Sequence, residues 1–197
     1  TRLGLVGIPR QAEIIMIERD IRLVELTGGR LHIAHVSTTE AVDAVRKAKA
    51  RGLPVTCDTS PPYFALNEVA IGDYRTFAKL SPPLREEADR RAVVEGIKDG
   101  TIGCIASDHT PQDEESKRLP FGVAASGGVG LETLLAVTLE LYHNGHVSIL
   151  EALNFITAAP ADLFKLRAGK LAQGRPADLM LFDPNKGWKV EADKLLS

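Results

Sequence analysis

The stretch Ile102-Gly103-Cys104-Ile105-Ala106-Ser107-Asp108-His109-Thr110-Pro111 determines the expected fold. Its first half is apolar, small and β-branched without alternation, which is typical of a strand covered on both faces. The apolar run then ends abruptly on polar side chains. In a parallel barrel, catalytic groups project from the carboxyl end of such a strand. The stretch therefore predicts a buried parallel strand that presents Asp108 at its tip.

A second stretch, residues 31–38, repeats this design, because an apolar run ends on His35 and then opens a helix. Two strands thus place an imidazole and a carboxylate at the same kind of position. A neutral His nitrogen and an Asp oxygen are ligand types of a catalytic zinc or a similar cation. The alternative is that His35 is a hydrogen-bonded core histidine and Asp108 caps a helix or turn. Spacing alone does not decide between these interpretations.

Composition describes an ordinary globular protein of 197 residues, 44% hydrophobic with a net charge of −2. That length allows one domain with a sizeable core, and the balanced charge gives no support to disorder or nucleic-acid binding. Neither a membrane-span-length apolar run nor a signal-peptide pattern is found, so the cytoplasm is the expected location. Cys57 and Cys104 lie in apolar runs outside any CxxC pair, and we expect both to be reduced and buried.

The chain reads as repeated strand-then-helix units, which favours an α/β fold with parallel strands. A capping box of Ser37 and Glu40 is expected to begin the second helix. The long connection over 59–80 is expected to be a substrate loop, since connections of that length are usually functional. Strands are predicted over 31–36, 53–58 and 102–107, and helices over 9–26, to Gly52, over 86–98, over 131–143, around Leu150, Leu153 and Ile156, and over 161–165.

Two later segments depart from the pattern of strand-then-helix units. Glycines over 126–130 either admit close approach of the backbone to a ligand or supply turns before the next helix. From Gly169 the pattern becomes turn, strand, turn, and Trp188–Val190 is predicted to begin another strand. A β segment after β/α units indicates a small appended sheet, which would need partner strands from elsewhere.

Six motifs, taken together and in order, resemble those of the dihydroorotases of the amidohydrolase superfamily. The resemblance extends along the whole chain but covers only the carboxyl-terminal half of such an enzyme. The motifs are His35-Val36-Ser37, Pro82-Pro83-Leu84-Arg85, Ser107-Asp108-His109-Thr110-Pro111, Phe121-Gly122, Gly130-Leu131-Glu132-Thr133 and Gly174-Arg175-Pro176-Ala177-Asp178-Leu179.

The resemblance implies a (β/α)₈ TIM barrel with a small composite β-sandwich built from both chain ends. Residues 1–168 would form the carboxyl-terminal half of the barrel, and residues 169–197 would supply strands of the sandwich. Such enzymes use one or two zinc ions to interconvert L-dihydroorotate and N-carbamoyl-L-aspartate in pyrimidine synthesis. By the same resemblance, His35 is a zinc ligand, and Asp108 both contacts the metal and acts as general base and acid.

Substrate contacts implied by the resemblance fall on Ser81, Gln112, Phe121 and Gly122. Two of these depart from the commonest dihydroorotase pattern, since Ser81 stands where many members have Asn and Gln112 where many have His. Both replacements can hydrogen-bond. A neutral amide at Gln112, however, cannot offer a substrate carboxylate the positive charge of a protonated His.

The first metal motif of the family, His-x-His, has no counterpart in the sequence, and a catalytic zinc usually takes three protein ligands. We therefore expect the isolated chain to be inactive and its metal site to be empty or partial. A half-barrel leaves sheet edges open, so we also expect it to pair with its missing half or to associate, as a homo-oligomer or with aspartate transcarbamoylase.

Two other functions remain open at this point. Hydantoinases and allantoinases share the fold and the metal chemistry but open different cyclic amides. The chain could also belong to an inactive dihydroorotase-like protein that survives as a structural partner of aspartate transcarbamoylase. Such proteins typically lose their metal ligands, so the presence of His35 and Asp108 argues against that second alternative.

Overall fold

A three-stranded parallel sheet lies at the centre of the computed structural model, which describes residues 4–5 and 7–197. The strands β1 (Leu31–Ile33), β2 (Val55–Thr59) and β3 (Cys104–Ile105) lie side by side in chain order. In the register, Leu31 is opposite Val55 and Asp58 is opposite Cys104. A helix connects each strand to the next, so the chain forms part of a (β/α)₈ barrel, as predicted.

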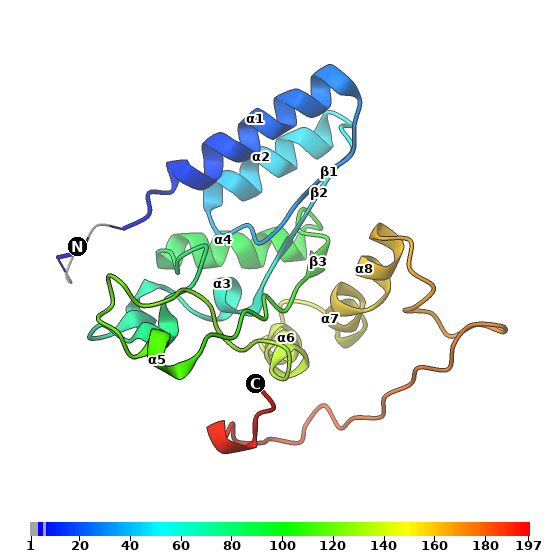
Figure 1. The fold of residues 1–197 in the computed structure, drawn as a ribbon. Helices are drawn as coiled ribbons and strands as arrows, with labels where there is room; N and C mark the ends of the chain where they lie inside the picture. The colour runs from blue at the N-terminus through cyan, green and yellow to red at the C-terminus, as the bar shows by residue number, and fades with distance from the viewer. Residues whose placement is uncertain (1–3, 6) are drawn as a thin grey trace.

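Three long helices, with α2 in the middle, cover one face of the sheet. They are α1 (Gln11–Thr27), α2 (Thr39–Ala50) and α4 (Glu87–Lys98), and α2 packs against both of the others. Figure 1 shows α1 and α2 side by side above β1 and β2. Apolar side chains at three- and four-residue steps turn towards the strands, which is the amphipathic pattern of the sequence. The buried residues of α2 are those predicted: Ala41, Val42, Val45 and Ala48.

The predicted capping box at the start of α2 is wrong. The N-cap is Thr38, whose side chain accepts a hydrogen bond from the Ala41 backbone N–H. The hydroxyl of Ser37 instead donates to a carboxylate oxygen of Glu13 on α1 at 2.5 Å. Ser37 thus lies one residue before the cap and binds an acceptor from another helix, which the sequence pattern could not indicate.

The connection between β2 and α4 is not a featureless loop. It contains α3 (Pro61–Ala65) and two 3₁₀ turns, η1 (Glu68–Ile71) and η2 (Thr76–Ala78). Two prolines at the start of α3 occupy the first helical turn, where a missing N–H costs nothing. The buried Tyr63 hydroxyl donates to the carbonyl oxygen of Pro82 at 2.8 Å, so α3 fixes the far end of its own connection.

The remaining helices follow β3 in the chain, and two of them, α7 and α8, pack against it. They are α5 (Glu114–Lys117), α6 (Leu134–His143), α7 (Ile149–Ile156) and α8 (Ala158–Leu163). The sequence pattern also predicts that Leu150 lines the buried side of its helix, and this is wrong, because Leu150 is 76% exposed. α7 buries Ala152 and Phe155 instead, since those positions face α6 and β3.

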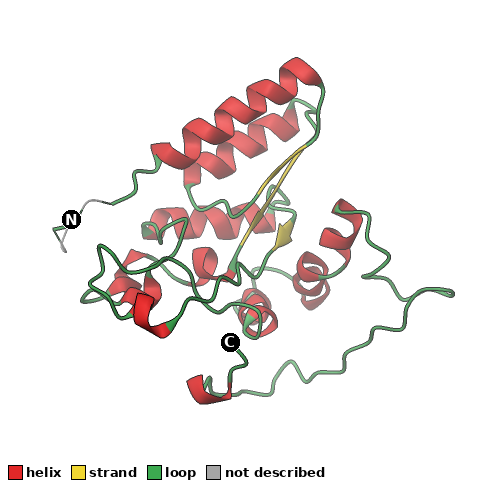
Figure 2. Ribbon diagram, in the orientation of Figure 1, coloured by secondary structure: helices red, strands yellow, loops and turns green. Residues whose placement is uncertain are grey.

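The tail beyond α8 forms no strand within the described residues. It runs as an extended loop, drawn green in Figure 2, apart from the 3₁₀ turn η3 (Ala192–Lys194). A strand needs a backbone partner, and among the described residues none pairs with 169–191. The predicted contribution of 169–197 to a composite sandwich therefore stays a prediction. Among the described helices, none is both long and apolar enough to cross a bilayer.

Candidate metal and catalytic site

His35 and Asp108 come together at the carboxyl edge of the sheet. His35 follows β1 and Asp108 follows β3, and His35 Nε2 lies 3.7 Å from Asp108 Oδ1. Both residues have a left-handed backbone, with φ of 55° and 47°. This conformation is unfavourable for residues with a side chain, and such strain concentrates at functional sites. The sequence predicted the two positions but not the backbone turn that brings the side chains together.

Asp58 contacts His35 from β2, the middle strand of the sheet. Its side chain is only 9% exposed, and its Oδ1 accepts the His35 backbone N–H at 2.7 Å. The same oxygen lies 3.1 Å from His35 Nδ1, which has no well-aligned hydrogen-bond partner among the described residues. The second oxygen, Oδ2, is 2.9 Å from Nε2 of His32. One carboxylate thus contacts both histidines.

These contacts and the burial of the site shift the pKa values of Asp58, His35 and Asp108. Burial raises the pKa of Asp58, but hydrogen bonds from His32 and His35 outweigh it and lower that pKa to about 2. The neighbouring Asp58 carboxylate raises the pKa of His35, against the opposing effect of burial. Burial raises the pKa of Asp108, and His35 offsets only part of that rise. A carboxylate of raised pKa beside an imidazole suits a group that exchanges protons.

The loop that carries Asp108 is held by the glycine-rich segment. His109 Nδ1 accepts the backbone N–H groups of Gly130 and Leu131, both at 3.2 Å. Gly130 packs so closely that an added Cβ would lie 2.1 Å from the carbonyl oxygen of Ser107. An added Cβ at Gly127 would similarly lie 2.4 Å from the Thr110 carbonyl oxygen. The glycines at 127 and 130 therefore permit close packing against the Asp108 loop.

Glu13 and Arg85 hold the segment after His35 in place. The carboxylate of Glu13 on α1 accepts the backbone N–H and hydroxyl groups of both Ser37 and Thr38. Arg85 lies against the same carboxylate at 3.4 Å, and its guanidinium also donates to Ile8 O. The arginine of the Pro-Pro-Leu-Arg motif thus joins α1 to the loop after β1.

The residues expected to contact substrate lie on two loops that Lys79 connects. Its ammonium group donates to the carbonyl oxygens of Phe121, Gly122 and Ala124. Ser81, two residues further along, is exposed. Gln112 is also exposed, and its Nε2 lies 3.5 Å from the Thr110 carbonyl oxygen. The loops are adjacent, and substrate contact by these four residues stays a prediction.

The donor atoms of His35 and Asp108 fit a zinc ion. Ligands about 2.0–2.2 Å from a tetrahedral zinc are separated by roughly 3.3–3.6 Å, close to the 3.7 Å between Nε2 and Oδ1. Two ligands fall short of the three that a catalytic zinc usually takes. As a candidate metal site, the pair is therefore incomplete, and a bound zinc would need further ligands.

A different trio, His32, Asp58 and Cys104, also groups possible ligand atoms within 4.8 Å of one another. In His32, both ring nitrogens are already engaged, because Nδ1 lies 2.8 Å from the Thr56 hydroxyl and Nε2 contacts Asp58. Burial raises the pKa of the Cys104 thiol to about 11, which disfavours the thiolate that binds metals. The His35–Asp108 pair is therefore the better candidate for a metal site. Both cysteines are free and buried, as predicted.

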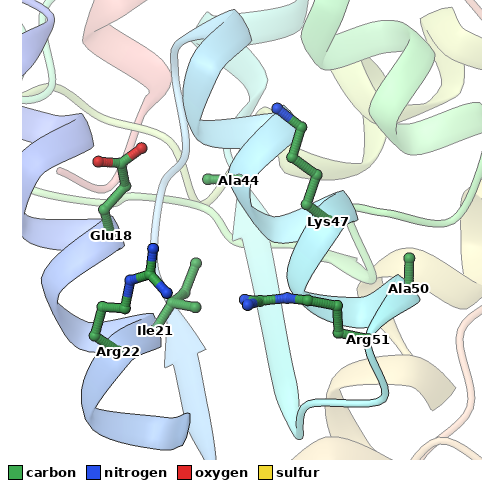
Figure 3. Close-up of a pocket in the computed structure, with 7 residues that line it drawn as sticks. All are labelled: Glu18, Ile21, Arg22, Ala44, Lys47, Ala50 and Arg51. Atoms are coloured by element: carbon green, nitrogen blue, oxygen red, sulfur yellow. The ribbon is translucent and has the colours of Figure 1, made fainter.

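A groove on the outer surface lies elsewhere, between α1 and α2. It encloses about 560 Å³ and is lined by side chains that include Glu18, Arg22, Lys47 and Arg51 (Figure 3). Arg22 and Arg51 both pair with Glu25. The groove is not lined by His35 or Asp108.

Comparison with known proteins agrees with this geometry. The model of the amidohydrolase family matches residues 11–195. The chain belongs to the amidohydrolase family. Over 196 residues it is 47% identical to a dihydroorotase of Anaplasma phagocytophilum (strain HZ), covering 99% of this chain and 44% of the relative. It is 49% identical over 199 residues to a dihydroorotase of Anaeromyxobacter dehalogenans (strain 2CP-C), covering 100% and 46%.

Solved structures of similar proteins share the amidohydrolase fold. A D-hydantoinase superimposes with a TM-score of 0.85 at 26% identity, covering 94% of this chain and 43% of that one. A dihydropyrimidinase from Brevibacillus agri NCHU1002 gives a TM-score of 0.80 at 27% identity, covering 86% and 39%. The chain spans somewhat less than half the length of the curated relatives that it matches.

Two members of the site, His32 and Asp58, were missed by sequence reasoning. Asp58 lies near the end of the middle strand, and His35 and Asp108 lie just after the outer two, so the same pattern of a polar residue at the end of an apolar run was available. His32 lies within β1, opposite Thr56, and shares a sheet face with Asp58. That register cannot be read from a single strand.

Proposed function

We propose that the protein containing this chain is a zinc-dependent dihydroorotase, which reversibly hydrolyses L-dihydroorotate to N-carbamoyl-L-aspartate in pyrimidine (UMP) synthesis. The observation that carries the proposal is the approach of His35 Nε2 to Asp108 Oδ1 at the carboxyl edge of a parallel sheet. Identity of 44–49% to the curated dihydroorotases supports this substrate.

In this proposal, His35 and Asp108 hold the metal together with ligands from outside these residues. Zinc supplies Lewis-acid activation of water and of the ring amide carbonyl. Asp108 takes a proton as water attacks that carbonyl and returns it to the leaving amide nitrogen. In the direction of ring closure, Asp108 makes the same transfers in reverse.

Substrate binding is proposed to involve Ser81, Gln112, Phe121 and Gly122. The Lys79 contacts support this, because they keep the loops of Ser81 and Phe121 adjacent. Ser81 and Gln112 can offer neutral hydrogen bonds only, so we expect the charge that balances the substrate carboxylate to come from another residue. The expectation that 169–197 completes a sandwich belongs to the same proposal.

The substrate is thus a small molecule, and the cytoplasm is the proposed location. Association as a homo-oligomer or with aspartate transcarbamoylase is proposed on the resemblance alone. We further expect these 197 residues to be inactive by themselves, since they supply two of at least three metal ligands. Intact protein is therefore the material for every assay.

A hydantoinase is the second candidate, and the match to D-hydantoinase structures favours it. Identity to those structures is 26–30%, below the values for dihydroorotases. Ring-opening assays of the intact protein with dihydroorotate, hydantoin and allantoin separate the candidates. We expect turnover of dihydroorotate to exceed turnover of the other two substrates. Turnover of hydantoin alone would instead support the hydantoinase candidate. Zinc-loaded protein that opens none of the three would leave only the non-catalytic alternative.

A further inference from the structure

Both carboxylate oxygens of Asp58 are engaged by neighbouring groups. Its carboxylate has one oxygen on His32 and the other on the His35 backbone. His32 is in turn fixed at its second ring nitrogen by the Thr56 hydroxyl, 2.8 Å away. Because both oxygens are engaged, the carboxylate cannot rotate without breaking a contact. The chain of contacts therefore sets the position of Oδ1.

Oδ1 of Asp58 lies 3.1 Å from Nδ1 of His35, on the opposite side of the imidazole from Asp108. A neutral imidazole carries one N–H and one lone pair, and the partner of one nitrogen selects the tautomer. A carboxylate can only accept, so it favours the proton on Nδ1. The lone pair is then on Nε2, which is the nitrogen aimed at Asp108.

We propose that Asp58, oriented by His32, is a positioning residue that holds His35 as the Nδ1–H tautomer, with Nε2 free to bind the metal. The inference rests on the proposed metal-dependent function and deepens it. Neither Asp58 nor His32 contacts substrate in this account. Metal-binding histidines commonly donate their other N–H to a carboxylate, and loss of such a partner weakens metal binding by about 10–100-fold.

The matched control is Asp89, on α4. Its carboxylate is also buried and accepts from the backbone and hydroxyl of Thr39 and from Arg10. It does not contact His35 or Asp108 in any described interaction. Asp58→Asn and Asp89→Asn thus remove comparable buried charges, but only Asp58 faces the imidazole of His35.

The test uses the intact protein and measures zinc affinity by chelator competition, together with the ¹⁵N chemical shifts of the His35 ring in the metal-free form. We expect Asp58→Asn to weaken zinc binding by about 10–100-fold and to reduce the Nδ1–H population. Asp89→Asn is expected to leave both unchanged while lowering stability. His32→Phe, which keeps an aromatic ring against Phe164, should weaken zinc binding in the same direction by a smaller factor.

If zinc affinity and the His35 tautomer are unchanged in both Asp58→Asn and His32→Phe, the positioning role is wrong, while wild-type zinc binding and turnover leave the proposed function intact. If Asp58→Asn does not fold, His32→Phe alone decides in the same way. A wild-type protein that neither binds zinc nor opens dihydroorotate would overturn the proposed function, and the inference with it.

Discussion

His35 and Asp108, which follow the two outer strands, both have a positive φ, but the protein holds the two strand ends differently. At the end of β1, a buried side chain of the neighbouring strand, Asp58, holds the backbone and faces the ring of His35. At the end of β3, the support for Asp108 comes from a loop, through His109 and the close packing of Gly130. One end is therefore held by a buried charge, and the other by close packing together with hydrogen bonds to a histidine ring.

This difference suggests a division of roles. A metal ligand needs a fixed tautomer, which a buried carboxylate can set. A general base needs a fixed position without another strong partner, and backbone packing supplies position without touching the carboxylate. We therefore expect the two ends to respond differently when each support is removed.

The largest effect is expected for Asp108→Asn, which removes the proton acceptor and keeps the shape of the side chain. We expect kcat for dihydroorotate to fall by a factor of about 10²–10⁴. Steady-state kinetics of the intact protein check this, with exposed Asp178→Asn as the control. A tenfold or smaller loss would remove Asp108 from the proton transfer.

Gly130→Ala tests the support that close packing gives to the Asp108 loop. The new methyl group would lie 2.1 Å from the Ser107 carbonyl oxygen, so the Asp108 loop must move. We expect a loss of about 3 kcal/mol in the free energy of unfolding and a parallel loss of kcat. Gly187→Ala is the matched control, because nothing lies within 4 Å of its added Cβ. Equal behaviour of the two variants in denaturant unfolding would contradict the packing argument.

Acid unfolding tests the electrostatic support. The pKa of Asp58 is lowered from 3.8 to about 2, so its contribution is present above pH 4 and is lost as pH falls towards 2. That shift corresponds to about 2 kcal/mol. Urea unfolding at pH 5 and pH 2.5 should show a steeper loss for wild type than for Asp58→Asn. Parallel losses would mean that Asp58 is not stabilised as the charged form.

His109→Ala should have the smallest effect. It leaves the N–H groups of Gly130 and Leu131 without their acceptor, but the site is partly open to water. We expect a loss of about 1 kcal/mol in stability, with zinc affinity unchanged. Thermal unfolding and chelator competition check both values. A large drop in zinc affinity would show that the two strand ends are not supported independently.

The helices and the order of the strands could be predicted from the sequence because apolar periodicity directly reflects burial. His35 and Asp108 were predicted for a similar reason, since a polar residue after an apolar run is visible in one strand. The role of Asp58 depends on register with β1, and the start of α2 depends on Glu13 from another helix. Such contacts between distant segments leave no local pattern.

In the tail, by contrast, the sequence favours strands that do not form among the described residues. A strand forms only with a backbone partner, and none of the described residues supplies one. Likewise, the left-handed backbones of His35 and Asp108 could not be predicted, because neither residue type requires that conformation. Local propensity predicts the elements, and the remainder depends on long-range packing.

The most direct test of the central claim is a zinc-edge anomalous difference map from crystals of the intact protein. The account predicts a peak about 2.0–2.2 Å from both Nε2 of His35 and a carboxylate oxygen of Asp108. A peak bound instead by His32, Asp58 and Cys104, with none between His35 and Asp108, would contradict it.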